Sequence, residues 1–325
     1  INSSYVTSLS LESILTELEN KLFNLTNEVK SQKLSTSAEL VNTIFFELKT
    51  KSLNPKLSGI SSGFYDLDAL TQGFQKSDLI IVAGRPSMGK TSLSLNIASN
   101  VIKNSKLPVL FFSLEMSKEQ IMYKLLSMET NINQMRLKGG KLYQNDWIKL
   151  TKMIKIISKF PLFIDDTFNL SIQDIKSKIK TILFEQNQLG LVIIDYIQLM
   201  QTTDFENENR VQELSKITRS LKKIAREFNI PIIGLSQLSR NVENRVDKKP
   251  ILSDLRESGS IEQDADLVIM LYKNKLENSS ASQSTSKTSK SIELIIAKHR
   301  NGPTGTVQLK FHEEQTKFFN KETNF

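Results

Sequence analysis

The sequence predicts an α/β fold with a mostly parallel central sheet flanked by helices. From about residue 57 onward, short apolar runs of strand type alternate with amphipathic helical stretches. Most of these runs lack a polar residue at every second position, as expected of strands that are covered on both faces. A glycine-rich phosphate-binding motif also stands between one such run and a helix, which is the context that this motif requires.

Composition excludes several classes of function. The chain has 325 residues, a formal charge of +8, no Cys and two His, His299 and His312. Disulfide scaffolds, thiol catalysis, Cys-based zinc sites and multi-His metal centres are therefore excluded. The longest apolar run, 267–272, is far too short to span a membrane, and no secretory signal opens the chain. The first residue is Ile1, which is compatible with a fragment.

Residues 1–55 are predicted to form a helical linker segment. Apolar residues at three- and four-residue steps predict a helix over 11–29, and a second, shorter stripe covers 38–48. Asn54-Pro55 closes the segment. The two helices must bury their stripes on another surface. The residues alone do not decide between the same chain and a neighbouring subunit.

Residues 56–325 carry the α/β pattern as one domain. A helix is predicted over 209–228, with one continuous apolar face. The last two runs, 292–298 and 306–311, are joined through Asn301-Gly302-Pro303 and predict a β-hairpin. Residues 278–291 are rich in Ser, Thr and Lys, which predicts a flexible insertion between two strands. The predicted strands are Leu79–Ala83, Val109–Phe112, Leu162–Ile164, Leu191–Ile194, Ile232–Leu235, Leu267–Tyr272 and Ile292–Ala297.

The phosphate-binding motif predicts a nucleotide site. It reads Gly84, Arg85, Pro86, Ser87, Met88, Gly89, Lys90, Thr91 and matches G-x-x-x-x-G-K-[ST]. Its glycines let backbone N–H groups turn toward phosphates, and the following helix N-terminus adds positive potential. Lys90 is expected to reach the β- and γ-phosphates of ATP, and the Thr91 hydroxyl to ligate Mg²⁺.

A phosphate loop of this kind needs a carboxylate on an adjacent strand to hold Mg²⁺. Asp195 ends the buried run 191–194 at the carboxyl edge, where ligands bind in open α/β sheets. Asp165 and Asp166 follow another strand and are its rivals. Asp195 is preferred because its strand is more uniformly apolar.

Two more polar residues follow strands at this edge. Glu115 comes after the run 109–112, where it is either a helix-start residue favoured by the dipole or a general base for water. Spacing alone does not decide between the helix-start and the general-base interpretation. Gln237 follows the run 232–235, where its neutral amide can hydrogen-bond a γ-phosphate or simply end the strand.

These motifs, in this order, resemble the DnaB-type replicative DNA helicases, whose motor domain is RecA-like. The segment 57–68 looks like the start of that motor. The successive motifs are GRPSMGKT, FFSLEMS, LVIIDYIQLM, GLSQLSR, DLRESGSIEQDADLVIML and AKHRNGPTG. The phosphate loop alone would admit many families. The joint presence of the later motifs is specific to this one, and together they cover nearly the whole chain.

The resemblance implies a role for each polar residue. Glu115 becomes the catalytic glutamate, Asp195 the Mg²⁺-associated aspartate, and Gln237 a γ-phosphate and DNA-coupling residue. Lys298 and Arg300 become a basic finger that enters the ATP site of the neighbouring subunit. Arg256, Glu257 and Gly259 match a pore loop that binds single-stranded DNA, where Arg256 suits a phosphate.

The resemblance also implies partners: single-stranded or forked DNA, a homohexameric ring and no membrane. It places the linker helix on the adjacent subunit. The family's N-terminal helical domain is not found in this sequence, so primase and a helicase loader are weaker expectations. The Lys-, Asn-, Ser- and Ile-rich composition suggests an AT-rich genome, either bacterial, with a cytoplasmic protein, or organellar, such as a plastid with a stromal one.

Two other functions compete with the helicase. A RecA-type recombinase filament would share the fold and the phosphate loop, but it would not need the helical linker at residues 11–29. A truncated chain that only binds partners would not need the intact motif 84–91 together with Glu115 and Asp195. ATPase activity stimulated by single-stranded DNA would separate the enzyme from an adaptor. Unwinding of a forked duplex would separate the helicase from a recombinase.

Overall fold

A computed structural model describes most of the chain, in two compact units. The described residues are 16, 18, 36–53, 57–200, 210–245, 247–255, 259–273 and 289–321. The units are Ile1–Lys56 and Leu57–Phe325.

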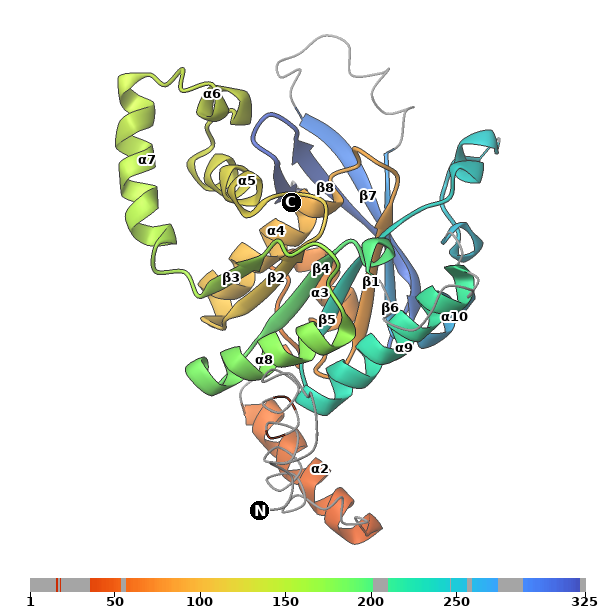
Figure 1. The fold of residues 1–325 in the computed structure, drawn as a ribbon. Helices are drawn as coiled ribbons and strands as arrows, with labels where there is room; N and C mark the ends of the chain where they lie inside the picture. The colour runs from red at the N-terminus through yellow and green to blue at the C-terminus, as the bar shows by residue number, and fades with distance from the viewer. Residues whose placement is uncertain are drawn as a thin grey trace, which may run out of the picture. The chain divides into compact units, whose positions relative to one another are not determined.

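The second unit is built on one nine-stranded sheet (Figure 1). Its strand order is β3-β2-β4-β5-β1-β6-β7-β8-β9. The strands from β3 to β6 pair in parallel, whereas β6 to β9 pair antiparallel. The strands are β1 (Leu79–Gly84), β2 (Val109–Ser113), β3 (Leu162–Asp165), β4 (Leu191–Asp195), β5 (Ile232–Gln237), β6 (Leu267–Tyr272), β7 (Ser289–His299), β8 (Gly305–His312) and β9 (Lys317–Asn320).

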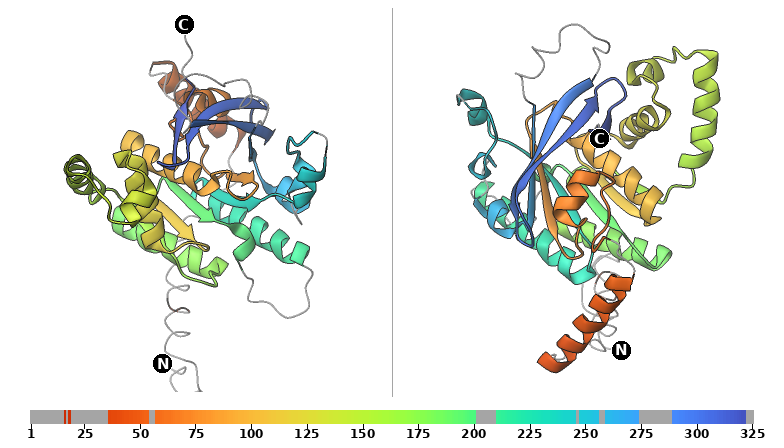
Figure 2. Two further views of the ribbon diagram at one scale, coloured as in Figure 1. Left: turned by 90° about the horizontal axis from the view of Figure 1, so that it is seen from above. Right: turned by 180° about the vertical axis from the view of Figure 1, so that it is seen from behind.

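Helices cover both faces of this sheet, as the two views of Figure 2 show. Along β1, Leu79 and Ile81 pack with α8 and α9 in one apolar cluster, whereas Ile80 and Val82 pack with α3 and α4 in the other. Both sides of the strand are therefore buried, which explains its unbroken apolar run. The helices are α3 (Tyr65–Thr71), α4 (Lys90–Asn100), α5 (Lys118–Thr130), α6 (Gln134–Lys138), α7 (Gln144–Ile157), α8 (Ile172–Gln186), α9 (Arg210–Phe228) and α10 (Gly259–Asp264).

The predicted fold class is confirmed. Each of the parallel strands begins where the sequence predicted, and most continue one or two residues further toward the carboxyl edge. The predicted helix over 209–228 is α9. No helix among the described residues is long and apolar enough to cross a membrane.

The C-terminal hairpin is longer than predicted. Strand β7 begins at Ser289, so the predicted insertion 278–291 is wrong over its last three residues. The reason is that β8 continues to His312 and offers backbone partners as far as Ser289. Residues 278–288 lie outside the described part. A further strand, β9, was not predicted and pairs with β8.

The first unit contains α2 (Ser37–Leu53), which covers the second predicted linker helix. Its apolar stripe is exposed at Val41, Ile44, Phe45 and Leu48. The first predicted helix, over 11–29, lies outside the described residues except for Thr16 and Leu18, both helical.

Candidate active site

Four adjacent strands bring the predicted polar residues to one edge of the sheet. In the order β2-β4-β5-β1, the carboxyl ends lead to Glu115, Asp195, Gln237 and the phosphate loop. Registers align these ends, since Ser113 pairs with Asp195 and Gly84 with Gln237. Parallel neighbours necessarily end at the same edge, so residues far apart in the sequence converge there.

A cavity of about 430 Å³ opens at this edge. It is lined by eight of the predicted residues: Pro86, Ser87, Gly89, Lys90, Thr91, Glu115, Asp195 and Gln237. The other lining residues are Ser92, Met116, Lys124, Tyr196, Phe311, Glu313 and Thr316. The volume lies within the range typical of small-molecule sites.

The phosphate loop has the backbone that an anion site needs. Ser87 (φ 64°) and Gly89 (φ 88°) both adopt left-handed conformations just before α4 begins at Lys90. A Cβ atom on Gly89 would also lie 3.1 Å from Phe318 and 3.2 Å from Phe311. Conformation and space together therefore favour glycine at this position, and they leave the helix N-terminus open to phosphates.

Charges around the cavity are desolvated. Burial lowers the pKa of Lys90, while the nearby carboxylates of Asp195 and Glu115 oppose that shift. In the structure Lys90 Nζ donates to the Gly84 carbonyl over 2.7 Å, so the ammonium is held at the mouth of the loop. A polyphosphate would supply the negative charge that such a buried cation favours.

Thr91 and Asp195 bring two side-chain oxygens together at the cavity. The Thr91 hydroxyl donates to Asp195 Oδ2 over 2.7 Å, and burial raises the pKa of Asp195. Among the described residues, no group of three or more acidic, His or Cys side chains is arranged so that it could hold a metal ion by itself. One hydroxyl and one carboxylate fit Mg²⁺, which commonly takes few protein ligands and completes its shell with phosphates and water.

The alternative carboxylates, Asp165 and Asp166, interact with lysines outside the cavity. Asp165 makes an ion pair with Lys178, and Asp166 lies 3.8 Å from the ammonium of Lys118. Asp165 is the last residue of β3, the outer strand of the sheet, and Asp166 follows it. Neither lines the cavity. The geometry therefore favours Asp195 over them.

Glu115 lies outside the helix that follows it. Helix α5 begins at Lys118, and Ser117 caps its first turn by accepting from Gln120 N. The helix-start interpretation of Glu115 therefore loses its basis, because another residue performs that role. Glu115 instead lines the cavity together with Lys90 and Asp195.

Gln237 ends β5 and also lines the cavity. Its backbone N–H points to Gln198 Oε1 at 3.4 Å, and Gln198 Nε2 donates to the Ser236 hydroxyl over 2.8 Å. Gln198 belongs to the turn after Asp195 and was not predicted. The contacts connect the ends of β4 and β5 next to the cavity.

Sequence reasoning missed Lys124. It lies on α5, lines the cavity, and has its pKa lowered by burial, against the carboxylates of Asp195 and Glu115. Helical lysines usually belong to a solvated face, so the sequence offered little sign of this role. Phe311, Glu313 and Thr316, from β8 and the turn to β9, were missed as well.

Arg85, although part of the motif, points away from the cavity. Its Nε lies 2.8 Å from Glu243 Oε1 and its Nη1 donates to the Leu238 carbonyl over 3.0 Å. Both partners follow β5. Gly84 and Met88 complete the loop without lining the cavity.

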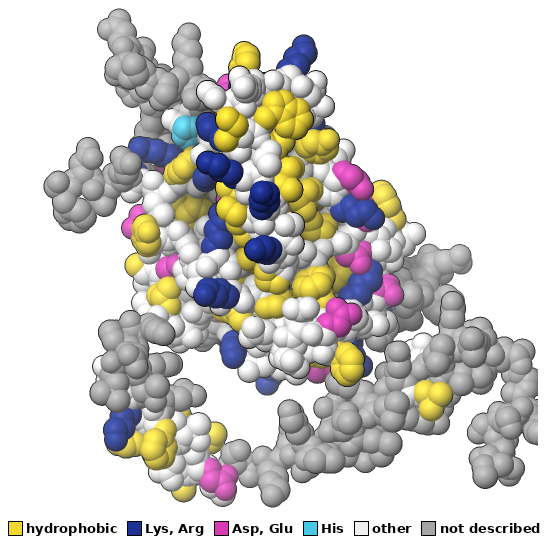
Figure 3. Space-filling view, turned by 90° about the vertical axis from the view of Figure 1, so that its left-hand side faces the viewer, with side chains coloured by type: hydrophobic (Ala, Val, Ile, Leu, Met, Phe, Trp, Pro, Cys, Tyr) yellow, Lys and Arg dark blue, Asp and Glu magenta, His cyan; other side chains and the backbone are white. Residues whose placement is uncertain are grey.

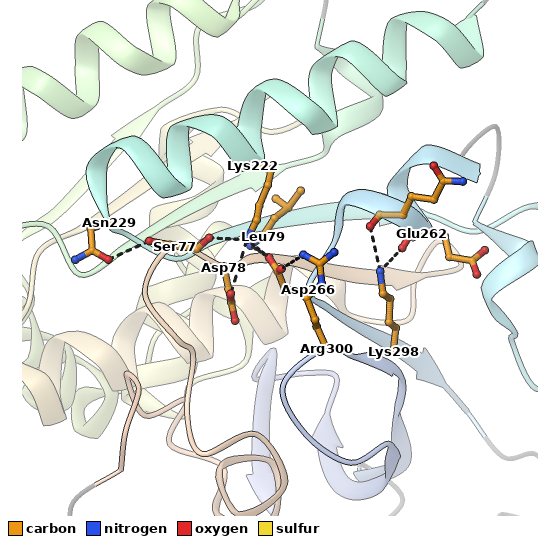
Figure 4. A network of polar contacts seen from close by, with 10 residues as sticks. Ser77, Asp78, Leu79, Lys222, Asn229, Glu262, Asp266, Lys298 and Arg300 are labelled. Carbon is orange, nitrogen blue, oxygen red and sulfur yellow. Dashed lines mark hydrogen bonds and ion pairs between the residues drawn. The ribbon is translucent and has the colours of Figure 1, made fainter. Parts of the chain in front are cut away.

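Lys298 and Arg300, the predicted finger, lie near Leu79 at the start of β1 (Figure 4), which is the edge of the sheet opposite to the phosphate loop. His299, between Lys298 and Arg300, pairs with Leu267, which in turn pairs with Ile80 near the start of β1. The phosphate loop leaves the far end of β1, at Gly84. At about 3.3 Å per residue this separates the finger from its own phosphate loop by about 13 Å along the strand alone.

The predicted DNA loop is described only at its end. Arg256 and Glu257 lie outside the described residues. Gly259 is the first residue of α10, which leads directly into β6.

Comparisons with known proteins identify one family. The family model for the DnaB-like helicase C-terminal domain matches residues 59–320. The chain is 64% identical over 319 residues to a probable replicative DNA helicase of Trieres chinensis, covering 98% of this chain and 70% of that protein. It is 44% identical over 322 residues to the replicative DNA helicase DnaB of Geobacillus stearothermophilus, with 99% and 70% covered.

Solved structures agree with these relatives. A solved ATPase domain superposes with a TM-score of 0.79 at 39% identity, covering 89% of this chain and 99% of that one. A DnaB-like replicative helicase, from a study of its interactions with primase, gives a TM-score of 0.77 at 37% identity, with 96% and 72% covered.

Proposed function

The chain belongs to the DnaB-like helicase family and is a replicative DNA helicase, and we propose that it works as an ATP-driven homohexameric ring on single-stranded DNA. The ring would unwind the duplex at the replication fork. Family membership makes the chain a nucleotide-hydrolysing enzyme and displaces the recombinase and adaptor alternatives.

The cavity supports ATP and Mg²⁺ as its contents. Lys90 and the N-terminus of α4 would hold the phosphates, and Thr91 and Asp195 would hold the metal. Mg²⁺ would neutralise charge on the phosphates. Glu115 would orient the attacking water and accept its proton, while the neutral amide of Gln237 would donate to the γ-phosphate without repelling it.

One observation carries the proposal of a shared site: the finger and the phosphate loop of one chain lie at opposite edges of the sheet. Arg300 cannot line its own cavity from there, so the ATP that it serves would belong to another molecule. The β7–β8 hairpin spans both edges. Phe311 lies at the cavity end and Arg300 follows the other end.

The mass of the particle in solution tests the ring. Native mass spectrometry or light scattering with a non-hydrolysable ATP analogue is expected to give six chains of about 37 kDa each. A monomer or dimer at micromolar concentration with the analogue bound would contradict the proposal.

A complementary surface supports docking of the linker on a neighbour. Residues 134–161 carry seven basic side chains and one acidic one, Asp146, which is buried. Exposed apolar side chains lie among them, and Figure 3 shows this face: Met135, Tyr143, Trp147, Ile148, Ile154 and Ile156. The predicted linker helix 11–29 has an apolar stripe, four Glu and one Lys. Its apolar and acidic groups would suit this face.

A charge placed on this face tests the docking proposal. Ile148→Asp is expected to lower the hexamer fraction, because a carboxylate would replace an apolar contact and repel the acidic helix. Phe184→Asp, at an exposed phenylalanine on α8, is the matched control and should leave assembly unchanged. Equal assembly of the two variants would locate the linker elsewhere.

The loop of Arg256, Glu257 and Gly259 is proposed to bind single-stranded DNA. Its support is the sequence match, together with the position of Gly259 as the first residue of α10. Arg256→Ala should weaken binding for every sequence and reduce the salt slope by about 0.7. An unchanged slope would place the DNA path at other bases, such as Arg240 or Lys248.

Primase and a loader are proposed as further partners. One structural neighbour was solved in a study of its interactions with primase, and the relatives are replicative helicases by name. The proposed compartment is the bacterial cytoplasm or the plastid stroma. A pull-down with the cognate primase and imaging of a tagged chain would test these two points.

A further inference from the structure

A buried carboxylate, Asp266, lies at the start of β6 beneath the finger. Only 3% of its side chain is exposed. Asp266 Oδ2 accepts a hydrogen bond from the Leu79 backbone N–H over 2.8 Å, and it also forms an ion pair with the Lys222 ammonium. The Lys222 ammonium also donates to the Ser77 carbonyl over 2.7 Å. The backbone of Asp266 donates to the Leu79 carbonyl over 2.9 Å, so the residue is fixed to the start of β1 on two sides.

The same residue holds Arg300 at two points. The Arg300 backbone N–H donates to the Asp266 carbonyl over 2.8 Å, and its guanidinium Nη1 donates to Asp266 Oδ1 over 3.1 Å. Asp266 therefore fixes both the backbone and the side chain of Arg300. Figure 4 shows Arg300 and Lys222 meeting Asp266 from opposite sides.

Lys298 is held by the segment just before Asp266. Its ammonium donates to the carbonyls of Glu262 and Gln263, over 2.5 and 3.2 Å, near the C-terminal end of α10. A cation at a helix C-terminus is favourable. Both finger bases thus contact the short stretch 262–266, which connects the DNA-loop helix to β6.

The contact between Asp266 and Arg300 orients the Arg300 side chain more than it stabilises the fold. The Arg300 side chain is 58% exposed, and an ion pair with so exposed a partner adds little to the free energy of unfolding. Asp266, in contrast, is fixed by three other groups and cannot follow the arginine. The guanidinium is therefore held by an immobile carboxylate while its remaining N–H groups face solvent. Such an arrangement leaves those groups free to bind a phosphate.

We propose that Asp266 is a positioning residue for hydrolysis, which aims Arg300 at the ATP of the neighbouring subunit. This rests on the proposed finger role of Arg300. Asp266 lies away from the cavity of its own chain and is buried, whereas Arg300 is exposed, so Asp266 is expected to act through Arg300. Its effect would appear only in the neighbour's site.

The test is Asp266→Asn in the assembled helicase. The amide can still accept from Leu79 but loses the charge that holds Arg300. The kcat of the ring should fall about 10- to 100-fold, and its KM for ATP should stay unchanged. The reason is that a misplaced Arg300 stabilises the charge of the transition state less well. Glu129→Gln, which removes another buried carboxylate paired with a lysine, Lys103, should keep the wild-type kcat.

Subunit mixing separates positioning from folding. Asp266→Asn has an intact phosphate loop and Lys90→Ala an intact finger, so mixed rings should regain ATPase activity where the two meet. A folding defect would not be complemented. If Asp266→Asn does not assemble, Asp266→Glu, which keeps the charge but moves it by one methylene, gives the same test.

The outcomes distinguish this inference from the finger assignment. Full activity of Arg300→Ala would overturn the finger itself. Loss of activity in Arg300→Ala with wild-type kcat in both Asp266 variants would overturn only the positioning role. Inactive Asp266 variants that assemble but regain no activity with Lys90→Ala would overturn it too.

Discussion

Thr91 and Asp195 are joined by a hydrogen bond of 2.7 Å, which connects the first turn of α4 to the carboxyl end of β4. Residues more than a hundred positions apart thereby present two oxygen ligands to one cavity. Asp195 is buried and its pKa is raised by that burial, although the charges of Lys90 and Lys124 oppose the shift, so ionising Asp195 still carries a desolvation cost. A divalent metal would relieve that cost.

Asp195→Asn should raise the Mg²⁺ concentration needed for half-maximal ATPase activity by at least about tenfold, because the amide is a neutral and weaker ligand. The measurement is a Mg²⁺ titration at saturating ATP. Asp165→Asn, outside the cavity, serves as the control. Coincident titration curves for Asp195→Asn and the wild type would remove Asp195 from the metal site.

Glu115→Gln should bind ATP normally and lose about 10² to 10⁴ in turnover, because the amide keeps the size of the side chain but cannot accept a proton from water. Nucleotide binding is followed with a fluorescent ATP analogue, and turnover by phosphate release. A parallel collapse of affinity would mean that Glu115 is structural.

Lys124→Met should lower kcat/KM by about tenfold or more while leaving the melting temperature unchanged or raised. Burial lowers the pKa of Lys124, so its charge is held in the cavity at a cost that a neutral side chain of similar length avoids. ATPase assays and thermal unfolding of the same preparation check both parts. Wild-type kinetics would exclude Lys124 from the nucleotide site.

Asp78→Asn should gain thermal stability relative to the wild type as the pH rises. Burial, with Asp266 adding, raises the pKa of Asp78 from 3.8 to about 6, against the nearby charges of Lys222, His299 and Arg300. The folded state therefore holds a proton that the unfolded state releases. That contribution to stability is full below pH 3.8 and is lost as the pH rises through about 6.

The measurement for Asp78 is the difference in melting temperature between variant and wild type from pH 4 to pH 8. The difference should grow through this window, because Asn does not ionise. A difference that is constant with pH would show that Asp78 keeps its ordinary pKa in the folded chain.

The parallel sheet was predictable because its strands are apolar on both sides, as Ile80 and Ile81 show. The site was predictable because polar residues that directly follow such strands, like Asp195, must meet at one edge. The short strand β9 was missed because four residues carry no periodicity. Its position depends on contacts distant in sequence, such as the stacking of Phe318 on Phe311 with ring centroids 4.3 Å apart.

Side chains whose role depends on where a helix packs could not be predicted. Lys124 would be an ordinary exposed lysine if α5 were rotated by half a turn. The role of Asp266 could not be predicted either, because a carboxylate before a strand is common in sequences. Its importance appears only when Leu79, Lys222 and Arg300 are brought around it.

Mixing two inactive variants tests whether each ATP site is completed by a residue of the neighbouring subunit. Arg300→Ala should bind ATP, assemble and lose about 10³ to 10⁵ in rate, as for other arginine fingers. Lys90→Ala should lack phosphate binding but keep its finger. The variant with both Lys298 and Arg300 changed to Ala is the control for residual charge from Lys298.

Mixed rings of Arg300→Ala and Lys90→Ala contain interfaces that combine an intact phosphate loop with an intact finger. These mixtures should show ATPase activity above the sum of the two variants measured separately, with a maximum at intermediate ratios. Mixtures that exchange subunits, as shown by mass, yet never regain activity would contradict a site completed across the interface. An Arg300→Ala enzyme with wild-type turnover would contradict it outright.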